Sequence, residues 1–240
     1  MLPDKYTYLA LMLASLAYPL AQSFEWRVYM HRRFHNIWPA ILITAAVFTI
    51  WDVYFTKAGV WSFSAEHTLS PRFIEMPLEE WMFFLVVPYC CFFVYFVVNY
   101  FIPSDPLKPY GKLIAIVLGI LMLVVGIAFF DRVYTSVATL GNGILLLFLA
   151  FFRNAKYLGR FFMGYLFCCI PFIVVNGILT NIPVVMYNNE ENTGIRIVIE
   201  GLANIPVEDL AYNMLMLLMN VSIYEYLEKS RPSLAPVRKR

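Results

Sequence analysis

Two short acidic motifs decide how this chain folds: Pro77-Leu78-Glu79-Glu80 and Pro206-Val207-Glu208-Asp209. The first leads into an apolar run at 81–102, and the second leads into another at 210–227. Each run approaches the ~20 residues that a helix needs to cross a bilayer. Ionisable groups at the mouth of a membrane helix are costly, so the four carboxyls are candidates for function.

The composition is that of a polytopic membrane protein. Of 240 residues, 61% are hydrophobic and 14% are charged, and the mean hydropathy is +0.68. A soluble domain of this size could not cover so much apolar surface. Seven apolar runs follow one another, at 6–22, 37–55, 81–102, 113–130, 137–152, 161–179 and 210–227. The sequence therefore predicts an all-α membrane protein with seven transmembrane helices.

The basic residues predict the orientation of these helices in the cell membrane. With seven spans, five Lys and Arg residues fall on the side of the N-terminus and thirteen on the side of the C-terminus. Because the richer side faces the cytoplasm, we expect a cytoplasmic C-terminus and an outside N-terminus. The basic residues form no continuous face, so a nucleic-acid partner is not expected.

Comparison of the chain with itself predicts two related halves. A shift of 129 residues aligns five positions around the first acidic motif with five around the second. Pro77, Glu79, Glu80, Phe83 and Tyr95 align, in this order, with Pro206, Glu208, Asp209, Tyr212 and Tyr224. A shift of 124 residues does the same for two further sets: Asp52, Thr56 and Phe63; Asn176, Thr180 and Tyr187. Two three-helix repeats, 1–102 and 134–228, are thus expected in parallel orientation, joined by a linker with helix four at 103–133 and followed by a basic tail at 229–240.

The acids have a purely structural interpretation as well as a chemical one. Proline at the first helical position and acids in the first turn stabilise many helix starts. Two copies at matching positions exceed what capping requires. Asp52 adds a third carboxyl, because it lies ~22 Å along its helix at 1.5 Å per residue and so reaches the same side of the membrane. Asp52 could equally form a hydrogen-bonded strut between helices or lie at the membrane interface beside an aromatic belt. Its counterpart Asn176 cannot donate a carboxyl proton.

Carboxyls in a dry cavity can act as acids. Desolvation raises the pKa of a carboxyl, and neighbouring carboxyls compete for one proton, so at least one can stay protonated near neutral pH. Aromatic faces can hold the cation that protonation of an apolar group would form. Interfacial anchoring is the alternative for any single aromatic residue. The predicted lining is Trp51, Trp61, Trp81, Phe83, Phe84, Asn176, Tyr187 and Tyr212.

Several motifs in combination resemble the integral-membrane lycopene cyclases. They are Trp51-Asp52, Gly59-Val60-Trp61-Ser62-Phe63, the stretch 77–84, Pro88-Tyr89, Asn176, Leu179-Thr180, the stretch 206–209 and Tyr224-Glu225. The chain looks like the fused form of a family that also occurs as two small bacterial subunits, and the resemblance covers nearly all of it. It departs from the family pattern at Phe96, where an acid is expected, and in the tract 69–72, where members often carry glycine.

The resemblance implies a reaction without redox chemistry. A carboxylic acid protonates the terminal double bond of the linear ψ end group of lycopene, the cation closes a six-membered ring, and loss of a proton gives the β ring. Glu79 or Glu80, and Glu208, are expected as proton donors, with Asp209 and Asp52 as counter-charges or proton acceptors. We expect lycopene or a related linear carotenoid as substrate, and neither cofactor nor metal.

Other membrane functions fit parts of the pattern. A proton-coupled small-molecule transporter can share the arrangement of three, one and three helices, and paired carboxyls suit it. Its sugar-carrying members have polar binding groups that this interior lacks. A retinal protein needs a lysine in its last span, and Lys229 lies beyond the run 210–227. A purely structural subunit would not explain the duplicated acids.

Overall fold

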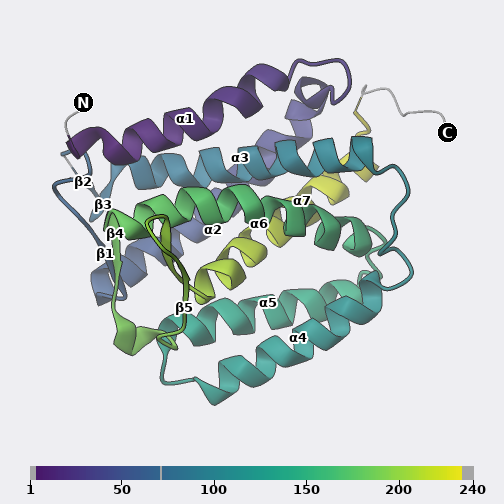
Figure 1. The fold of residues 1–240 in the computed structure, drawn as a ribbon. Helices are drawn as coiled ribbons and strands as arrows, with labels where there is room; N and C mark the ends of the chain where they lie inside the picture. The colour runs from purple at the N-terminus through teal and green to yellow at the C-terminus, as the bar shows by residue number, and fades with distance from the viewer. Residues whose placement is uncertain (1–3, 71, 234–240) are drawn as a thin grey trace.

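The computed structural model describes residues 4–70 and 72–233 and is a bundle of seven α-helices (Figure 1). Each predicted apolar run overlaps one helix. The helices are α1 Thr7–Gln22, α2 Phe34–Ala58, α3 Leu78–Phe101, α4 Gly111–Ala128, α5 Val133–Phe151, α6 Leu158–Asn181 and α7 Glu208–Ser230. Three short 3-10 helices accompany them, at Asp4–Tyr6, Met30–Arg33 and Asn189–Glu191.

Within the described residues, five helical segments are long and apolar enough to cross a membrane, which indicates a membrane-associated protein. They are Met30–Ala58, α3, α4, α5 and α6. Helix α1 has 16 residues, fewer than the ~20 that a bilayer requires. Helix α7 is less apolar because it carries the buried polar residues Asn213 and Asn220. Seven helices are therefore present, whereas seven membrane spans stay a prediction.

Three antiparallel strand pairs correct the expectation of a purely helical chain. They are β1 Trp61–Phe63 with β4 Val185–Tyr187, β2 Arg72–Phe73 with β3 Met76–Pro77, and β5 Arg196–Ile199 with β6 Ala203–Pro206. Strands of two to four residues leave no periodic signal in the sequence, because too few side chains alternate. The labelled strands lie toward one end of the bundle, which we call the strand end (Figure 1).

The pairing of β1 with β4 joins the loop after α2 to the loop after α6. Ser62 lies opposite Met186 at the centre of the pair, and Trp61 lies opposite Tyr187. Ser62 and Met186 are also related by the shift of 124 residues that matches the two halves of the sequence. Each loop therefore contacts its own counterpart, as in a two-fold symmetric interface.

Small residues let α4 pack closely on α5. The buried residues of α4 are Gly111, Ala115, Gly119 and Gly126. A Cβ atom added at Gly143 of α5 would lie 2.9 Å from the carbonyl oxygen of Gly119, too close for any larger residue without a shift. Small residues four positions apart, as at Gly111, Ala115 and Gly119, are typical of closely packed helix pairs inside membranes. Large apolar side chains of α4 point outward, where they can contact lipid: Val117, Ile120, Leu121, Val124 and Ile127.

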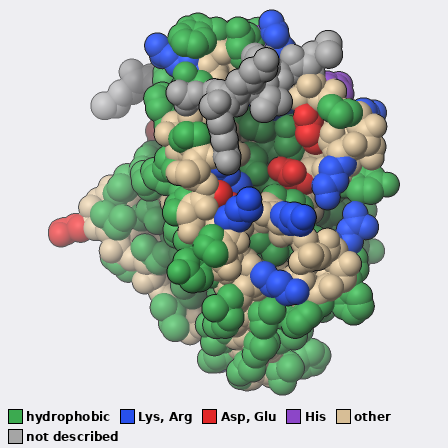
Figure 2. Space-filling view, turned by 90° about the vertical axis from the view of Figure 1, so that its right-hand side faces the viewer, with side chains coloured by type: hydrophobic (Ala, Val, Ile, Leu, Met, Phe, Trp, Pro, Cys, Tyr) green, Lys and Arg blue, Asp and Glu red, His purple; other side chains and the backbone are tan. Residues whose placement is uncertain are grey.

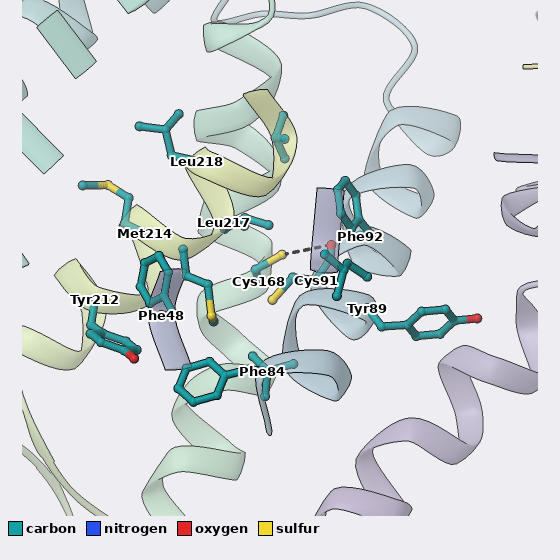
Figure 3. Close-up of a cluster of buried hydrophobic side chains, with 14 of the residues drawn as sticks. Phe48, Phe84, Tyr89, Cys91, Phe92, Cys168, Tyr212, Met214, Leu217 and Leu218 are labelled. Carbon is teal, nitrogen blue, oxygen red and sulfur yellow. Dashed lines mark hydrogen bonds between the residues drawn. The ribbon is translucent and has the colours of Figure 1, made fainter. Parts of the chain in front are cut away.

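The core forms around α7, which passes between the other helices. Its side chains Tyr212, Met214, Leu217 and Leu218 pack with Phe48 of α2, Phe84, Cys91 and Phe92 of α3, and Cys168 of α6 (Figure 3). The thiol of Cys168 donates to the carbonyl oxygen of Cys91 at 3.6 Å. Both cysteines are buried and unbridged, in agreement with a packing role.

Lys and Arg side chains gather on the face seen in Figure 2, at the end opposite the strands. Helix α7 ends there at Ser230, so the predicted basic tail 229–240 begins inside the helix, and residues 234–240 lie outside the described part of the chain. Both acidic motifs lie at the strand end, where α3 and α7 begin. The four carboxyls of the motifs thus lie at the end opposite the Lys and Arg side chains that Figure 2 shows.

Candidate active site

The four acids of the two motifs occupy the first turns of α3 and α7, and all are buried. Glu79 and Glu80 are 0% and 7% exposed, and Glu208 and Asp209 are 2% and 3% exposed. Pro77 precedes α3 in an extended conformation, with φ −67° and ψ 156°. The fixed φ of proline suits this position, and the acids complement the positive end of the helix dipole.

A small cavity of about 40 Å³ collects residues from both halves at the strand end. Three of the predicted carboxyls line it: Asp52 from α2, Glu80 from α3 and Asp209 from α7. The remaining lining residues are Tyr8, Trp61, Phe63, Phe83, Tyr134, Phe172, Asn176, Leu179, Val185, Tyr187 and Tyr212. The cavity therefore combines acids with aromatic faces, as the sequence predicts.

Asp209 accepts hydrogen bonds from three side chains. The hydroxyl of Tyr134 donates to Oδ1 at 2.6 Å. Oδ2 accepts from Nδ2 of Asn176 at 2.6 Å and from the hydroxyl of Tyr187 at 2.8 Å. Three donors stabilise a negative charge on a carboxylate, and their number and short distances are typical of charge-assisted bonds.

Tyr187 lies in β4 and keeps its proton over a wide pH range. Burial, and next the negative charge of Asp209, raise the pKa of Tyr187 well above its ordinary value. The phenol therefore remains a donor to Asp209 at neutral and mildly alkaline pH. The antiparallel pairing of Tyr187 with Trp61 places this donor at the junction of the two halves.

Glu80 has a sparser environment than Asp209. The hydroxyl of Tyr8 donates to Oε2 of Glu80 at 2.7 Å. Asp52 is 2% exposed and lies close enough to Glu80 for the two charges to interact, and Trp61 lies beside it. Oδ2 of Asp52 is buried without a hydrogen-bond partner among the described residues. Two buried carboxyls with so few donors are favoured to share a proton.

No cation neutralises these carboxyls within the described ranges 4–70 and 72–233. The ion pairs found there join Arg27 to Glu25 and Arg132 to Asp131, both away from the cavity. Burying a charge without a partner is costly, so a proton is the natural means of neutralising one of the acids. This arrangement can donate a proton to an apolar group and hold the resulting cation.

Glu79 and Glu208 do not line the cavity and instead hold loops. Oε1 of Glu79 accepts from the backbone N–H of Leu69 at 2.8 Å, and Oε1 of Glu208 accepts from the backbone N–H of Thr193 at 2.7 Å. Thr135 also donates to Oε1 of Glu208 at 2.7 Å. The two glutamates thus make corresponding contacts in the two halves.

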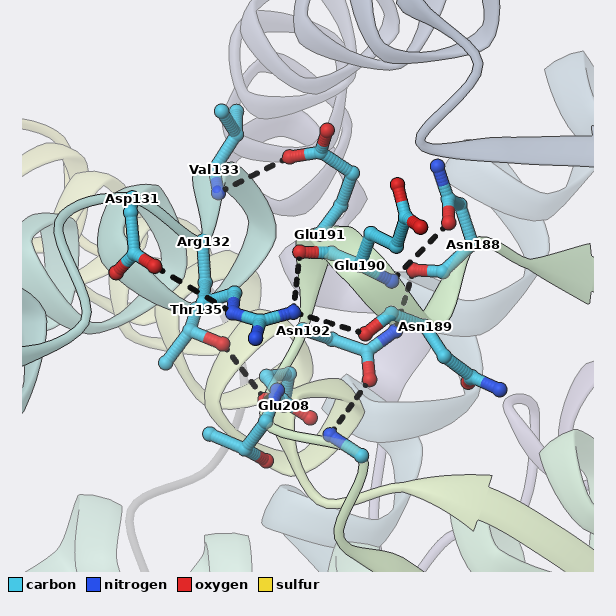
Figure 4. A network of polar contacts seen from close by, with 12 residues as sticks. Asp131, Arg132, Val133, Thr135, Asn188, Asn189, Glu190, Glu191, Asn192 and Glu208 are labelled. Carbon is cyan, nitrogen blue, oxygen red and sulfur yellow. Dashed lines mark hydrogen bonds and ion pairs between the residues drawn. The ribbon is translucent and has the colours of Figure 1, made fainter.

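The loop beside Glu208 is bound further to the start of α5 (Figure 4). Arg132 donates to the carbonyl oxygens of Asn189 at 3.3 Å and Glu190 at 2.7 Å. The backbone N–H of Val133 donates to Glu191 at 3.3 Å. These contacts fix the loop that carries Tyr187, so they position a donor of the cavity indirectly.

Three aromatic residues predicted to line the cavity lie elsewhere. Trp51 packs against Tyr212 with ring centroids 4.8 Å apart, behind the cavity wall. Trp81 is partly exposed and donates from its indole to the carbonyl oxygen of Phe73 at 3.2 Å. Phe84 is buried against Phe83 in the core. The sequence places all three near the motifs but does not give the direction of each side chain.

Six lining residues were not predicted: Tyr8, Phe63, Tyr134, Phe172, Leu179 and Val185. Tyr8 and Tyr134 matter most, because each donates to an acid of the cavity. They are 126 residues apart, close to the shifts that relate the other matched positions. Extending the self-comparison into α1 and α5 could have found this pair.

Comparison with known proteins gives the family of the chain. The family model described as lycopene cyclase matches residues 5–98 and 131–227, which is more than half of the chain. The chain belongs to the lycopene cyclase family. The resemblance noted in the sequence is thereby confirmed, and the two matched segments contain both acidic motifs and their tyrosine partners.

A curated relative of this lycopene cyclase family member comes from Neurospora crassa and is described as a bifunctional lycopene cyclase/phytoene synthase. The two are 33% identical over 93 residues, which cover 38% of this chain and 14% of the relative. The chain therefore matches only a small part of that longer protein. No solved structure matches the chain.

Proposed function

We propose that this protein is a lycopene β-cyclase. In this proposal it converts the linear ψ end group of lycopene or a related carotenoid to a β ring by acid catalysis, as an intramolecular lyase or isomerase. The observation that carries the proposal is the cavity in which Asp52, Glu80 and Asp209 meet aromatic faces, with no ion pair to any of these three carboxyls among the described residues. The family membership supplies the class of substrate.

Glu80 is the proton donor in this mechanism. Its carboxyl lines the cavity and shares a proton with Asp52, because both are buried close together. The proton adds to the terminal double bond and leaves a tertiary cation. The π electrons of the internal double bond then form the ring bond, and a ring proton leaves to the deprotonated carboxyl pair. One proton enters and one leaves, so the product is an isomer of the substrate.

Asp209 is the counter-charge to the cation. Its three donors occupy both carboxylate oxygens, which disfavours covalent capture of the cation by the carboxylate. Preorganised charges of this kind, held in a dry site, contribute strongly to catalysis. The faces of Trp61 and Tyr212 add further stabilisation of positive charge.

This assignment differs from the donors that the sequence alone suggests. The sequence offers Glu79 as an alternative to Glu80, and Glu208 as a further donor. The loop contacts of Glu79 and Glu208 and their position outside the cavity favour a structural task for both. Asp52 and Asp209 keep the roles of proton acceptor and counter-charge.

We further propose that all seven helices span the cell membrane as two three-helix repeats with α4 between them. Corresponding contacts support this arrangement: Tyr8 with Glu80 matches Tyr134 with Asp209. The pairing of Ser62 with Met186, which occupy matching positions in the two halves, also supports two related repeats. The N-terminus is then outside and the basic end cytoplasmic.

Expression in cells that accumulate lycopene, followed by pigment chromatography, tests the function. We expect cyclised carotenoid with the wild-type protein and linear lycopene with Glu80→Gln. Linear lycopene alone with a well-expressed wild-type protein would contradict the proposal. Proton-driven uptake of a small solute into proteoliposomes without any pigment conversion would favour a transporter instead.

A further inference from the structure

A groove of about 270 Å³ lies between α1, α3 and α6. It is larger than the cavity lined by Asp52, Glu80 and Asp209, here called the acid cavity, and lies beside it. Helices α1 and α6 both pack against α3, and the groove lies where the three meet. Among the residues that the structure describes, no charged side chain lines it. Its residues are Ser15, Tyr18, Pro19, Phe83, Val87, Cys90, Cys91, Phe93, Val94, Cys168, Pro171, Phe172, Val175 and Asn176.

The groove adjoins the acid cavity. Phe83, Phe172 and Asn176 line both spaces, so the two are separated by the rings of the two phenylalanines. Along α3 the groove runs from Phe83 to Val94, a distance of about 16 Å at 1.5 Å per residue. Tyr18 at its edge is 67% exposed, so the groove is open to the surroundings of the bundle.

In the other half, the side chain of Trp51 fills the place that corresponds to the groove at Val175. The shift of 124 residues lays Val175 on Trp51 and Phe172 on Phe48. Trp51 packs against Phe48, Phe55 and Tyr212, with ring centroids 5.3, 5.4 and 4.8 Å apart. A large indole therefore stands where the groove has a small valine, and one side of the cavity is closed.

The geometry points to the groove as the entrance for the extended hydrocarbon chain of a linear polyene, which comes sideways from the membrane. We infer that the end group passes between Phe83 and Phe172 to reach the acids, and that Val175, where the other half has Trp51, makes this the entrance on one side only. The inference rests on the proposed function for the identity of the polyene. An uncharged lining that leads directly to the acids fits a hydrocarbon substrate.

The acid cavity must widen when the end group enters. Its volume of about 40 Å³ is room for only a few water molecules, since one water needs about 10–15 Å³, and a six-membered carbon ring with its methyl groups is larger. Phe83 and Phe172 are the movable part of the wall, because both also border the open groove. Binding of the substrate thus displaces aromatic rings and not backbone.

Two neighbouring valines provide a matched test. Val175 lines the groove, whereas Val174 is 43% exposed on the outer face of the same helix. We expect Val175→Trp to lower cyclisation about tenfold or more, since the chain can no longer reach the acids. Val174→Trp should retain wild-type cyclisation. Val94→Trp, at another position in the groove, is a second blocking variant in case Val175→Trp folds poorly.

Binding is measured separately from catalysis. Lycopene retained by purified Glu80→Gln protein is quantified by absorbance, with and without Val175→Trp, and bound phospholipid is quantified in parallel. Loss of lycopene with Val175→Trp but not with Val174→Trp supports the entrance, even if the wild-type protein cyclises nothing and the proposed function fails. Unchanged lycopene in both, or loss of phospholipid alone, would overturn it and assign the groove to a lipid chain.

Discussion

The two halves of the proposed repeat place their acids in different surroundings. In the first half, Glu80 receives one tyrosine hydroxyl and lies beside the carboxyl Asp52. In the second half, Asp209 receives one tyrosine hydroxyl, a second from Tyr187, and the amide of Asn176. Two changes at matching positions, Asp52 to Asn176 and Phe63 to Tyr187, therefore separate a pair of acids from a buried carboxylate with three hydrogen-bond donors.

In the proposed mechanism, this difference lets one fold provide both a proton and a counter-charge. A protonated carboxyl starts the reaction, and a fixed carboxylate stabilises the cation that follows. Two identical halves would offer either two acid pairs or two anions. The same asymmetry recurs in packing, because Val175 leaves a groove where Trp51 closes one.

The largest effect is expected for Glu80→Gln. Loss of the proton donor should lower the cyclisation rate by about 10²–10⁴-fold. Glu79→Gln is the matched control, because Glu79 accepts a hydrogen bond from the backbone N–H of Leu69 and does not line the cavity. Rates are measured with lycopene in detergent or liposomes. Equal losses in the two variants would remove the distinction between cavity and loop.

Asp209→Asn should have the next largest effect. Removing the fixed negative charge is expected to lower the rate by about 10²–10³-fold while substrate binding is kept. The readout is single-turnover cyclisation beside retained lycopene. If Asp209→Asn behaved as wild type and Glu80→Gln did not, Asp209 would have no part in stabilising the cation.

A moderate effect on cyclisation is expected when Trp51, which fills the place in the first half that matches the groove at Val175, is replaced by a smaller residue. Trp51→Val in the Val175→Trp background should raise cyclisation about fivefold over Val175→Trp alone, because it provides a second route past Phe48. Trp51→Val by itself should lower the free energy of unfolding by about 3 kcal/mol, since it leaves a cavity. No recovery in a folded double variant would show that only the α1–α3–α6 side can admit substrate.

The smallest effect concerns stability at high pH. The pKa of Tyr187 is raised in the folded protein, so the folded state holds its proton more tightly than the unfolded state. This contribution is fully present below about pH 10, the ordinary value for tyrosine, and is lost as the pH rises toward the folded pKa. Tyr187→Phe should be less stable by about 1–2 kcal/mol at pH 7 and should lose less stability between pH 9 and 11. Unfolding midpoints of the two proteins in detergent, measured across this pH range, give both quantities. If the two proteins lost stability equally between pH 9 and 11, the raised pKa of Tyr187 would be contradicted.

The sequence predicts the helices and the acids but not their directions. Long apolar runs and the two motifs located α3 and α7 because membrane length and first-turn acids are local signals. Which of Glu79 and Glu80 enters the cavity depends on the rotation of α3, which the motif does not specify. Tyr8 was missed because a single tyrosine in an apolar run carries no signal of its partner 72 residues away.

The most direct test of the account is cyclisation of lycopene by purified protein in D₂O. The account holds that a carboxyl in equilibrium with solvent supplies the proton that starts ring closure. It predicts one deuterium on the protonated ring carbon for every ring formed, and no ring formation with Glu80→Gln. Rings formed by the wild-type protein without deuterium would contradict it.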